Sequence, residues 1–371
     1  NVPSMANSGR NIRFQNMSID EGLSQGTVHA IVQDHHGFMW FGTQEGLNRF
    51  DGYNFRVFRN DPKDLTSLSH DWIWDVHESR SKELWVGTDG GGLVKLNPDG
   101  ESFTIYRNDP ADPNSLSNDR VRAIAEDQEG ILWVGTDGGG LNRFDPEKQL
   151  FSRFVQDPSN ASSLSDDRIR AIQIARDGGI WVGTDGGGLE WFDPSTESFH
   201  HYRHNPDNEH SLNQDRIRSL HEDNEGNLWI GTYDKGLDRF DPQTGRFAHT
   251  RQGLIDDRGL PHDRVRAIYQ DRDGVIWIAT DFGLAEWSKD EDRFIGYKHQ
   301  PTHRTSLSDN RVMSLYQDRG GVLWVGTCAG VDKWNLLTGA FAHYQHDPND
   351  PSQLSGNVVN GFAEDRSGSI W

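Results

Sequence analysis

Residues 121–146 read VRAIAEDQEGILWVGTDGGGLNRFDP, and this unit recurs with changes along most of the chain. A tryptophan opens the LWVGT core of each copy. The spacings between successive tryptophans are 45, 48, 48, 48, 48, 47 and 47 residues, for Trp40, Trp85, Trp133, Trp181, Trp229, Trp277, Trp324 and Trp371. A fixed period of this length is typical of stacked or radial repeat proteins.

Each unit reads as four short strands, predicted in this copy at 121–126, 132–136, 141–144 and 151–155. The connections between them are rich in Gly and Asp. Glycine allows positive φ and aspartate caps a turn through its own side chain, so these connections are hairpin turns. Four antiparallel strands in about 40–50 residues are typical of one β-propeller blade. The sequence therefore predicts an all-β fold, a β-propeller of four-stranded antiparallel blades, in which the repeated Trp packs between neighbouring blades.

The order of the copies predicts how the ring closes. An outer strand near residues 12–17 stands alone before the first copy, and propellers often close by adding such a strand to the last blade. Seven repeats follow within residues 1–344, with inner strands starting near Val28, Ile73, Val121, Ile169, Ile217, Val265 and Val312. Residues 345–371 begin a further repeat. A seven-bladed ring is favoured, with 345–371 opening a second propeller, and an eight-bladed ring is the alternative.

Composition limits the classes of partner. The 371 residues carry 37 basic and 57 acidic side chains, giving a net charge of −20. This charge argues against sequence-independent binding to nucleic acid and against contact with an anionic membrane. The single cysteine, Cys328, cannot form an internal disulfide. No apolar run approaches the roughly 18 residues that a membrane-spanning helix requires.

The repeated pattern D-x-x-G-x-[LI]-W-[VI]-G-T resembles the two-component regulator propeller repeat. The first copy is similar throughout, with DEGLS at 20–24, GFMWFGT at 37–43 and GLNRFDG at 46–52. The resemblance implies the periplasmic sensor region of a bacterial signalling protein. It also implies a second propeller or a membrane-linked signalling domain elsewhere in the full-length protein, since paired seven-bladed propellers precede those parts in this family.

Two positions at the start of each inner strand carry cationic or aromatic side chains in most copies. Inner strands of a propeller start near the mouth of the central channel, so side chains at these positions should form a ring. The candidate ligand-binding residues are His29, Trp72, Trp74, Arg120, Arg122, Arg168, Arg170, Arg216, Arg218, Arg264, Arg266 and Arg311.

The recurring arginines have two interpretations. In the first, each arginine pairs with an aspartate in the turn between the second and third strands of a blade, namely Asp137, Asp185, Asp234 and Asp281. In the second, the arginines bind an anion or an acidic sugar, with Trp72 and Trp74 as stacking platforms. Arg311 is the first candidate for a free arginine, because Cys328 replaces the aspartate of its turn.

Motifs for other chemistry are weak. The Gly-rich turns join strand to strand, whereas a phosphate loop needs a following helix. The histidines lack zinc-type spacing, and no metal or cofactor is expected. The sequence thus predicts a non-enzymatic sensing domain for a carbohydrate or an anionic small molecule. The alternatives are a protein-interaction scaffold and a streptogramin-lyase-like enzyme. The enzyme is disfavoured because such propellers place histidine and a metal ion at the channel mouth, and His29 is the only histidine at the candidate positions.

Overall fold

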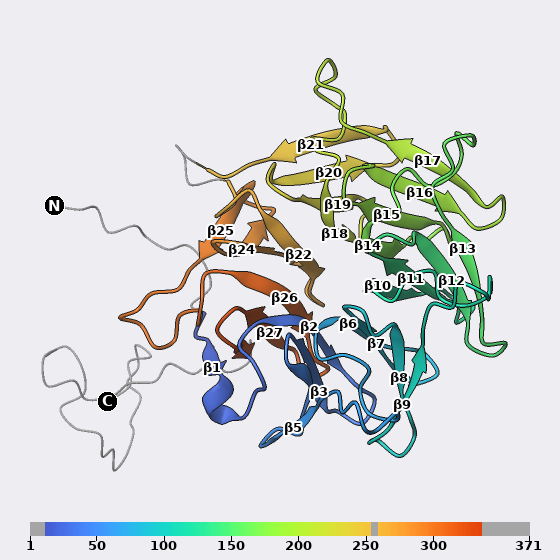
Figure 1. The fold of residues 1–371 in the computed structure, drawn as a ribbon. Helices are drawn as coiled ribbons and strands as arrows, with labels where there is room; N and C mark the ends of the chain where they lie inside the picture. Colours follow the sequence, from blue (N-terminus) through green and yellow to red (C-terminus); the bar gives the residue numbers. More distant parts are fainter. Residues whose placement is uncertain (1–11, 254–258, 336–371) are drawn as a thin grey trace, which may run out of the picture. The chain divides into compact units, whose positions relative to one another are not determined.

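The structure, a computed structural model, describes residues 12–253 and 259–335 of the chain. They form seven four-stranded antiparallel sheets within a compact unit that ends at Trp334. Figure 1 shows the sheets following one another around a common centre, and the inner strand of the first blade packs against the seventh blade. The prediction of a seven-bladed all-β propeller is confirmed, and the eight-bladed alternative is wrong because the ring already closes.

Six of the blades are continuous in sequence, and their strands run from the channel to the perimeter. The strands are β2 Val28–Gln33, β3 Met39–Thr43, β4 Gly46–Phe50, β5 Phe55–Phe58; β6 Ile73–Glu78, β7 Leu84–Thr88, β8 Leu93–Leu96, β9 Phe103–Tyr106; β10 Val121–Glu126, β11 Leu132–Thr136, β12 Leu141–Asp145, β13 Leu150–Phe154; β14 Ile169–Ile174, β15 Ile180–Thr184, β16 Leu189–Asp193, β17 Ser198–Tyr202; β18 Ile217–Glu222, β19 Leu228–Thr232, β20 Leu237–Asp241, β21 Arg246–Thr250; and β22 Val265–Gln270, β23 Ile276–Thr280, β24 Gly283–Ser288, β25 Arg293–Tyr297.

The seventh blade is built from both ends of this unit. It contains β26 (Val312–Gln317), β27 (Val322–Thr327) and β28 (Val331–Asn335), and β1 (Gln15–Met17) is its outer strand. A short 3₁₀ turn, η1 (Ile19–Glu21), then leads toward the first blade. Residues 345–371, where the sequence predicts a further repeat, lie outside the described residues.

Large apolar side chains fill the space between neighbouring blades. The ring of Trp133 on β11 lies 5.4 Å from Phe192 on β16, and Trp181 on β15 lies 5.6 Å from Phe240 on β20. The predicted role of the repeated Trp as an inter-blade anchor is confirmed. In six of the seven blades a glycine lies two residues after the anchor, where the blades come closest, and the sixth blade has Ala279 there. A Cβ on Gly183 would lie 2.6 Å from Ile217 Cγ2 of the next blade.

Candidate functional site

A β-bulge lies at the start of the inner strand in all seven blades. In the third blade Val121 pairs with Thr136 and Ala123 pairs with Gly135, so Arg122 has no partner across the ladder. A bulge turns a side chain away from the regular alternation of the strand. The seven bulged residues all line one cavity at the channel, and they are His29, Trp74, Arg122, Arg170, Arg218, Arg266 and Met313.

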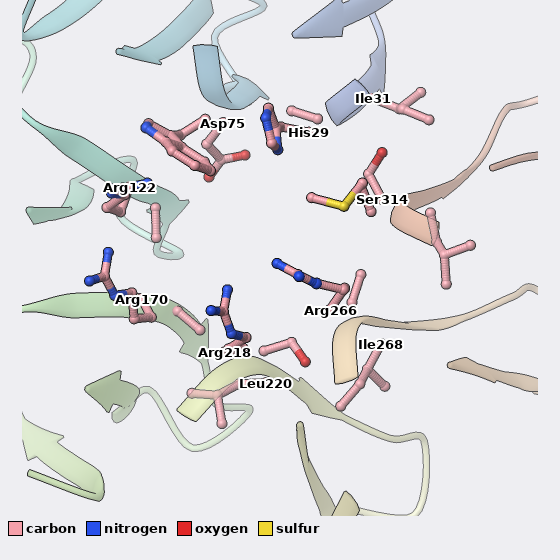
Figure 2. Close-up of a pocket in the computed structure, with 18 of the residues that line it drawn as sticks. His29, Ile31, Asp75, Arg122, Arg170, Arg218, Leu220, Arg266, Ile268 and Ser314 are labelled. Carbon is pink, nitrogen blue, oxygen red and sulfur yellow. The ribbon is translucent and has the colours of Figure 1, made fainter. Parts of the chain in front are cut away.

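The cavity has a volume of about 770 Å³. Figure 2 shows Arg218 and Arg266 extending into it from neighbouring strands, with His29 on the other side. Of the predicted site residues, nine line the cavity, namely His29, Trp72, Trp74, Arg122, Arg170, Arg216, Arg218, Arg266 and Arg311. The other three predicted arginines do not line it. Their side chains are 60%, 50% and 42% exposed, for Arg120, Arg168 and Arg264 respectively.

Carboxylates between the blades neutralise part of this cationic ring. Arg122 donates to Asp137 at 2.9 Å and lies 3.7 Å from Asp89 of the preceding blade. Arg170 repeats this arrangement, at 2.7 Å from Asp185 and 3.2 Å from Asp137. Burial raises the pKa of Asp137 and of Asp185, but their arginine partners outweigh it and hold both pKa values below the ordinary value. These turn aspartates therefore link arginines of successive blades.

The pairing continues on the other side of the channel. Arg216 donates from Nε to Asp185 at 2.9 Å, and Arg266 donates to Asp281 at 2.6 Å. Arg311 lies 3.9 Å from Asp281 of the preceding blade. The prediction that Arg311 is the free arginine is therefore wrong, because its carboxylate comes from a neighbouring blade rather than from its own turn.

The fifth blade breaks the pattern at Tyr233. The residue that follows the second strand is Gln44, Asp89, Asp137, Asp185, Tyr233, Asp281 and Cys328 in the seven blades. The Tyr233 N–H donates to the carbonyl of Arg216 at 3.0 Å, the bond that the turn aspartate makes in its neighbours. The predicted partner Asp234 is one residue too late and instead accepts from Gln214 at 2.6 Å. Aligning the turns by the threonine that ends each second strand would have found this substitution.

Arg218 is left without a carboxylate as a result. No hydrogen bond or ion pair of its guanidinium occurs within residues 12–253 and 259–335, and the group lies 4.3 Å from the centre of the Tyr233 ring. Arg216 approaches the same ring at 3.8 Å. Burial, and then the positive charge of Arg266, lowers the pKa of Arg218 to about 10. Positive charge is thus concentrated where the fifth and sixth blades meet.

Aromatic side chains of the first two blades form the facing wall. Trp72 and Trp74 stack at 5.3 Å between ring centres, and His29 lies 4.6 Å from Trp74. The Arg122 guanidinium lies 3.8 Å from the centre of Trp74, so this indole already has two stacking partners. Burial, together with the charges of Arg122 and Arg266, lowers the pKa of His29 to about 4. His29 is therefore neutral at pH 7.

Several buried polar atoms of the cavity lining have no hydrogen-bond partner in the described part of the chain. They are Trp72 Nε1, Trp74 Nε1, Arg122 Nε, Arg218 Nε and Ser219 Oγ. Buried polar groups of native proteins are nearly always hydrogen-bonded to protein or to ordered water, so a cluster of exceptions is a place that water or a ligand would fill. Four of these atoms are N–H groups that only donate. The cavity therefore suits a molecule rich in hydrogen-bond acceptors.

Other chemistry finds little support in the described ranges. No group of three or more His, Cys, Asp or Glu side chains is arranged there to hold a metal ion. Burial raises the pKa of the Cys328 thiol, which disfavours the reactive thiolate. None of the helices in the same ranges is long and apolar enough to cross a bilayer.

Comparison with known proteins fits this geometry. Six segments match the two component regulator propeller family, at residues 22–45, 115–138, 163–186, 211–234, 259–282 and 306–329. These six segments are two-component regulator propeller repeats. Each matched segment from 115 onward ends in the turn that carries the Asp, Tyr or Cys of the channel rim, so the repeat itself supplies this part of the site.

Two similar proteins are named as signalling proteins. Histidine kinase P4 of Formosa agariphila is 48% identical over 59 residues, which are 16% of this chain and 4% of that protein. The extracellular domain of a putative hybrid two component system from B. thetaiotaomicron is 27% identical, with a TM-score of 0.77, over 97% of this chain and 46% of that domain. The chain thus spans less than half the length of either relative.

A more distant likeness shows the fold alone. A streptogramin B lyase structure has a TM-score of 0.62 at 15% identity, over 87% of this chain and 97% of the lyase. At this identity the shared propeller carries no information about catalysis.

Proposed function

We propose that this chain is the extracytoplasmic sensing propeller of a bacterial signal-transduction protein, and that it binds a carbohydrate or an anionic small molecule at the channel mouth. The observation that carries the proposal is a cluster of buried N–H groups, on Trp72, Trp74, Arg122 and Arg218, that have no hydrogen-bond partner among the described residues. The matched repeats and the extracellular domain of the hybrid system support a sensory role and an extracytoplasmic location.

The sensor acts by binding rather than by catalysis in this proposal. A ligand shifts an equilibrium only when it binds two states unequally. The channel lining comes from all seven blades, so a bound molecule would touch several blades and change how they pack. A second propeller or a membrane-linked signalling domain of the full-length protein would receive that change.

A protein-interaction scaffold is the second candidate, favoured by the ion pairs that already neutralise Arg122, Arg170 and Arg266. A thermal-shift screen of mono- and oligosaccharides, including uronic-acid and sulfated forms, separates the two. The sensor proposal expects at least one compound to raise the melting temperature, and a variant with Trp74→Ala to lose that shift. If no compound shifts the melting of the wild-type protein, the scaffold is the better account.

A further inference from the structure

The repeat register shows where the charge balance of the channel fails. Four blades place an aspartate directly after the second strand, and the third, fourth and sixth blades pair it with their own bulged arginine. The fifth blade keeps the bulged arginine, Arg218, but has Tyr233 in place of the aspartate. One missing carboxylate in an otherwise repeated pair leaves one guanidinium without its counter-charge.

The surroundings of Arg218 do not replace the missing charge. Six arginines and two aspartates are among the residues that line the cavity, and the aspartates are Asp75 and Asp185. Asp75 already accepts from the backbone N–H groups of Val76 and Ile124, at 2.9 and 2.8 Å. Asp185 is bound by Arg170 and Arg216. Neither carboxylate is therefore available to Arg218.

The Tyr233 ring positions the Arg218 guanidinium without neutralising its charge. The ring carries Arg216 at 3.8 Å, Arg218 at 4.3 Å and Arg264 at 5.0 Å, so cation–π contacts fix the position of three cations without neutralising any. The buried Nε of Arg218 and the buried Oγ of the adjacent Ser219 both lack a hydrogen-bond partner in the described residues. A planar guanidinium in this state matches the two oxygens of a carboxylate or a sulfate group.

We propose that Arg218, with Arg266 beside it and Tyr233 as its support, binds an oxyanion group of the channel ligand, so that the ligand is a carboxylated or sulfated compound rather than a neutral one. This inference rests on the proposed function, because it assigns one part of the same cavity. In it, the ligand oxyanion supplies the counter-charge that the turn aspartate supplies in the third, fourth and sixth blades.

The repeat itself provides the decisive variant. Tyr233→Asp restores the aspartate of the other blades, and its carboxylate would pair with Arg218 and compete with any ligand oxyanion. The variant should fold, because the same turn position already holds aspartate in four blades. Arg218→Gln removes the cation by a second route. Two controls change charge elsewhere: Gln128→Asp adds a carboxylate in an exposed turn at the other end of its blade's inner strand, and Arg56→Gln removes an exposed cation on an outer strand.

Isothermal titration at low ionic strength with D-glucuronate, inorganic sulfate and D-glucose tests the assignment. We expect both anions to bind the wild-type protein and D-glucose to bind less. Tyr233→Asp and Arg218→Gln should each weaken the anions at least about tenfold, and Gln128→Asp and Arg56→Gln should leave them within about twofold. Anion binding that survives both site variants overturns the assignment.

The remaining outcomes separate this inference from the proposed function. If neither anion binds but a neutral oligosaccharide does, the oxyanion subsite is wrong and the sensing role stands. If neither the anions nor any sugar binds, both fail. Thermal melting of each variant, recorded alongside, shows whether a loss of binding comes from a loss of folding.

Discussion

Ser79→Asp should stabilise the propeller by completing a hydrogen bond that the second blade lacks. In five blades an aspartate six residues before the anchor tryptophan accepts its indole N–H, as Asp127 accepts from Trp133 Nε1 at 2.8 Å. The second blade has Ser79 at this position, and the buried Trp85 Nε1 has no partner in the described residues. Ser79 already accepts from the N–H of Glu83, as Asp127 accepts from Ile131. An aspartate at position 79 would therefore be placed to accept both the Glu83 N–H and the Trp85 indole N–H.

The expected gain is a balance of two terms. A hydrogen bond to a charged acceptor contributes about 1.5–3 kcal/mol net. Repulsion from the neighbouring, partly exposed Glu83 carboxylate subtracts up to about 1 kcal/mol. We expect the free energy of unfolding to rise by about 1–2 kcal/mol, which corresponds to about 2–4 °C in melting temperature for a domain of this size. The reverse change, Asp127→Ser, should cost about 2–3 kcal/mol because it leaves the Trp133 N–H unpaired.

Differential scanning calorimetry at pH 7 on the two variants measures both effects. Ser79→Asn is the matched control, because the amide has the shape of the carboxylate but only one acceptor oxygen. If that oxygen accepts from the Glu83 N–H, the amide NH₂ faces the indole N–H, and if it accepts from the indole, the bond to Glu83 is lost. It should show no gain. The reasoning is refuted if Ser79→Asp melts at or below the wild-type temperature while Asp127→Ser is destabilised, because an equivalent carboxylate would then not act equivalently in the second blade.

Three further predictions concern other parts of the ring. Burial raises the pKa of Asp332, at the seam between β28 and β1, to about 6. The stability that protonation of Asp332 contributes is complete below its unfolded pKa of about 4 and is lost as the pH rises through 6. The melting temperature of Asp332→Asn should therefore depend less on pH between 4 and 7 than that of the wild-type protein. Both ring nitrogens of His249 face acceptors, Asp238 Oδ1 at 2.7 Å and a backbone carbonyl at 2.9 Å, and the bond to Asp238 raises the pKa of His249. Wild-type stability should therefore fall as the pH rises above the ordinary histidine pKa of about 6.5, and His249→Gln should abolish that part of the slope. Gly183→Ala should destabilise by about 1–3 kcal/mol in urea unfolding, because its Cβ would meet the Ile217 side chain at 2.6 Å, and an unchanged midpoint would show that the blades can move apart.

Most of the fold could be predicted because each blade is a local unit. The inner strands start at the predicted residues in all seven blades, and the strands of the third blade differ from their predicted bounds by at most one residue. A hairpin repeat brings together segments that are close in sequence, so period and turn residues suffice. The number of blades was less certain, because closure depends on how β1, β28 and β2 meet across about 300 residues of chain.

The candidate site divides in the same way. Sequence alone determined that cationic and aromatic side chains gather at one end of the inner strands, because a repeat puts equivalent residues at equivalent places in the ring. Only the tertiary structure decided which of these cations has no carboxylate partner within residues 12–253 and 259–335. Asp281 reaches Arg311 from the neighbouring blade, and the turn of the fifth blade presents Tyr233 rather than Asp234 to Arg218. Charge pairing at this rim acts between blades as well as within them, and distances between blades are set by how the closed ring packs.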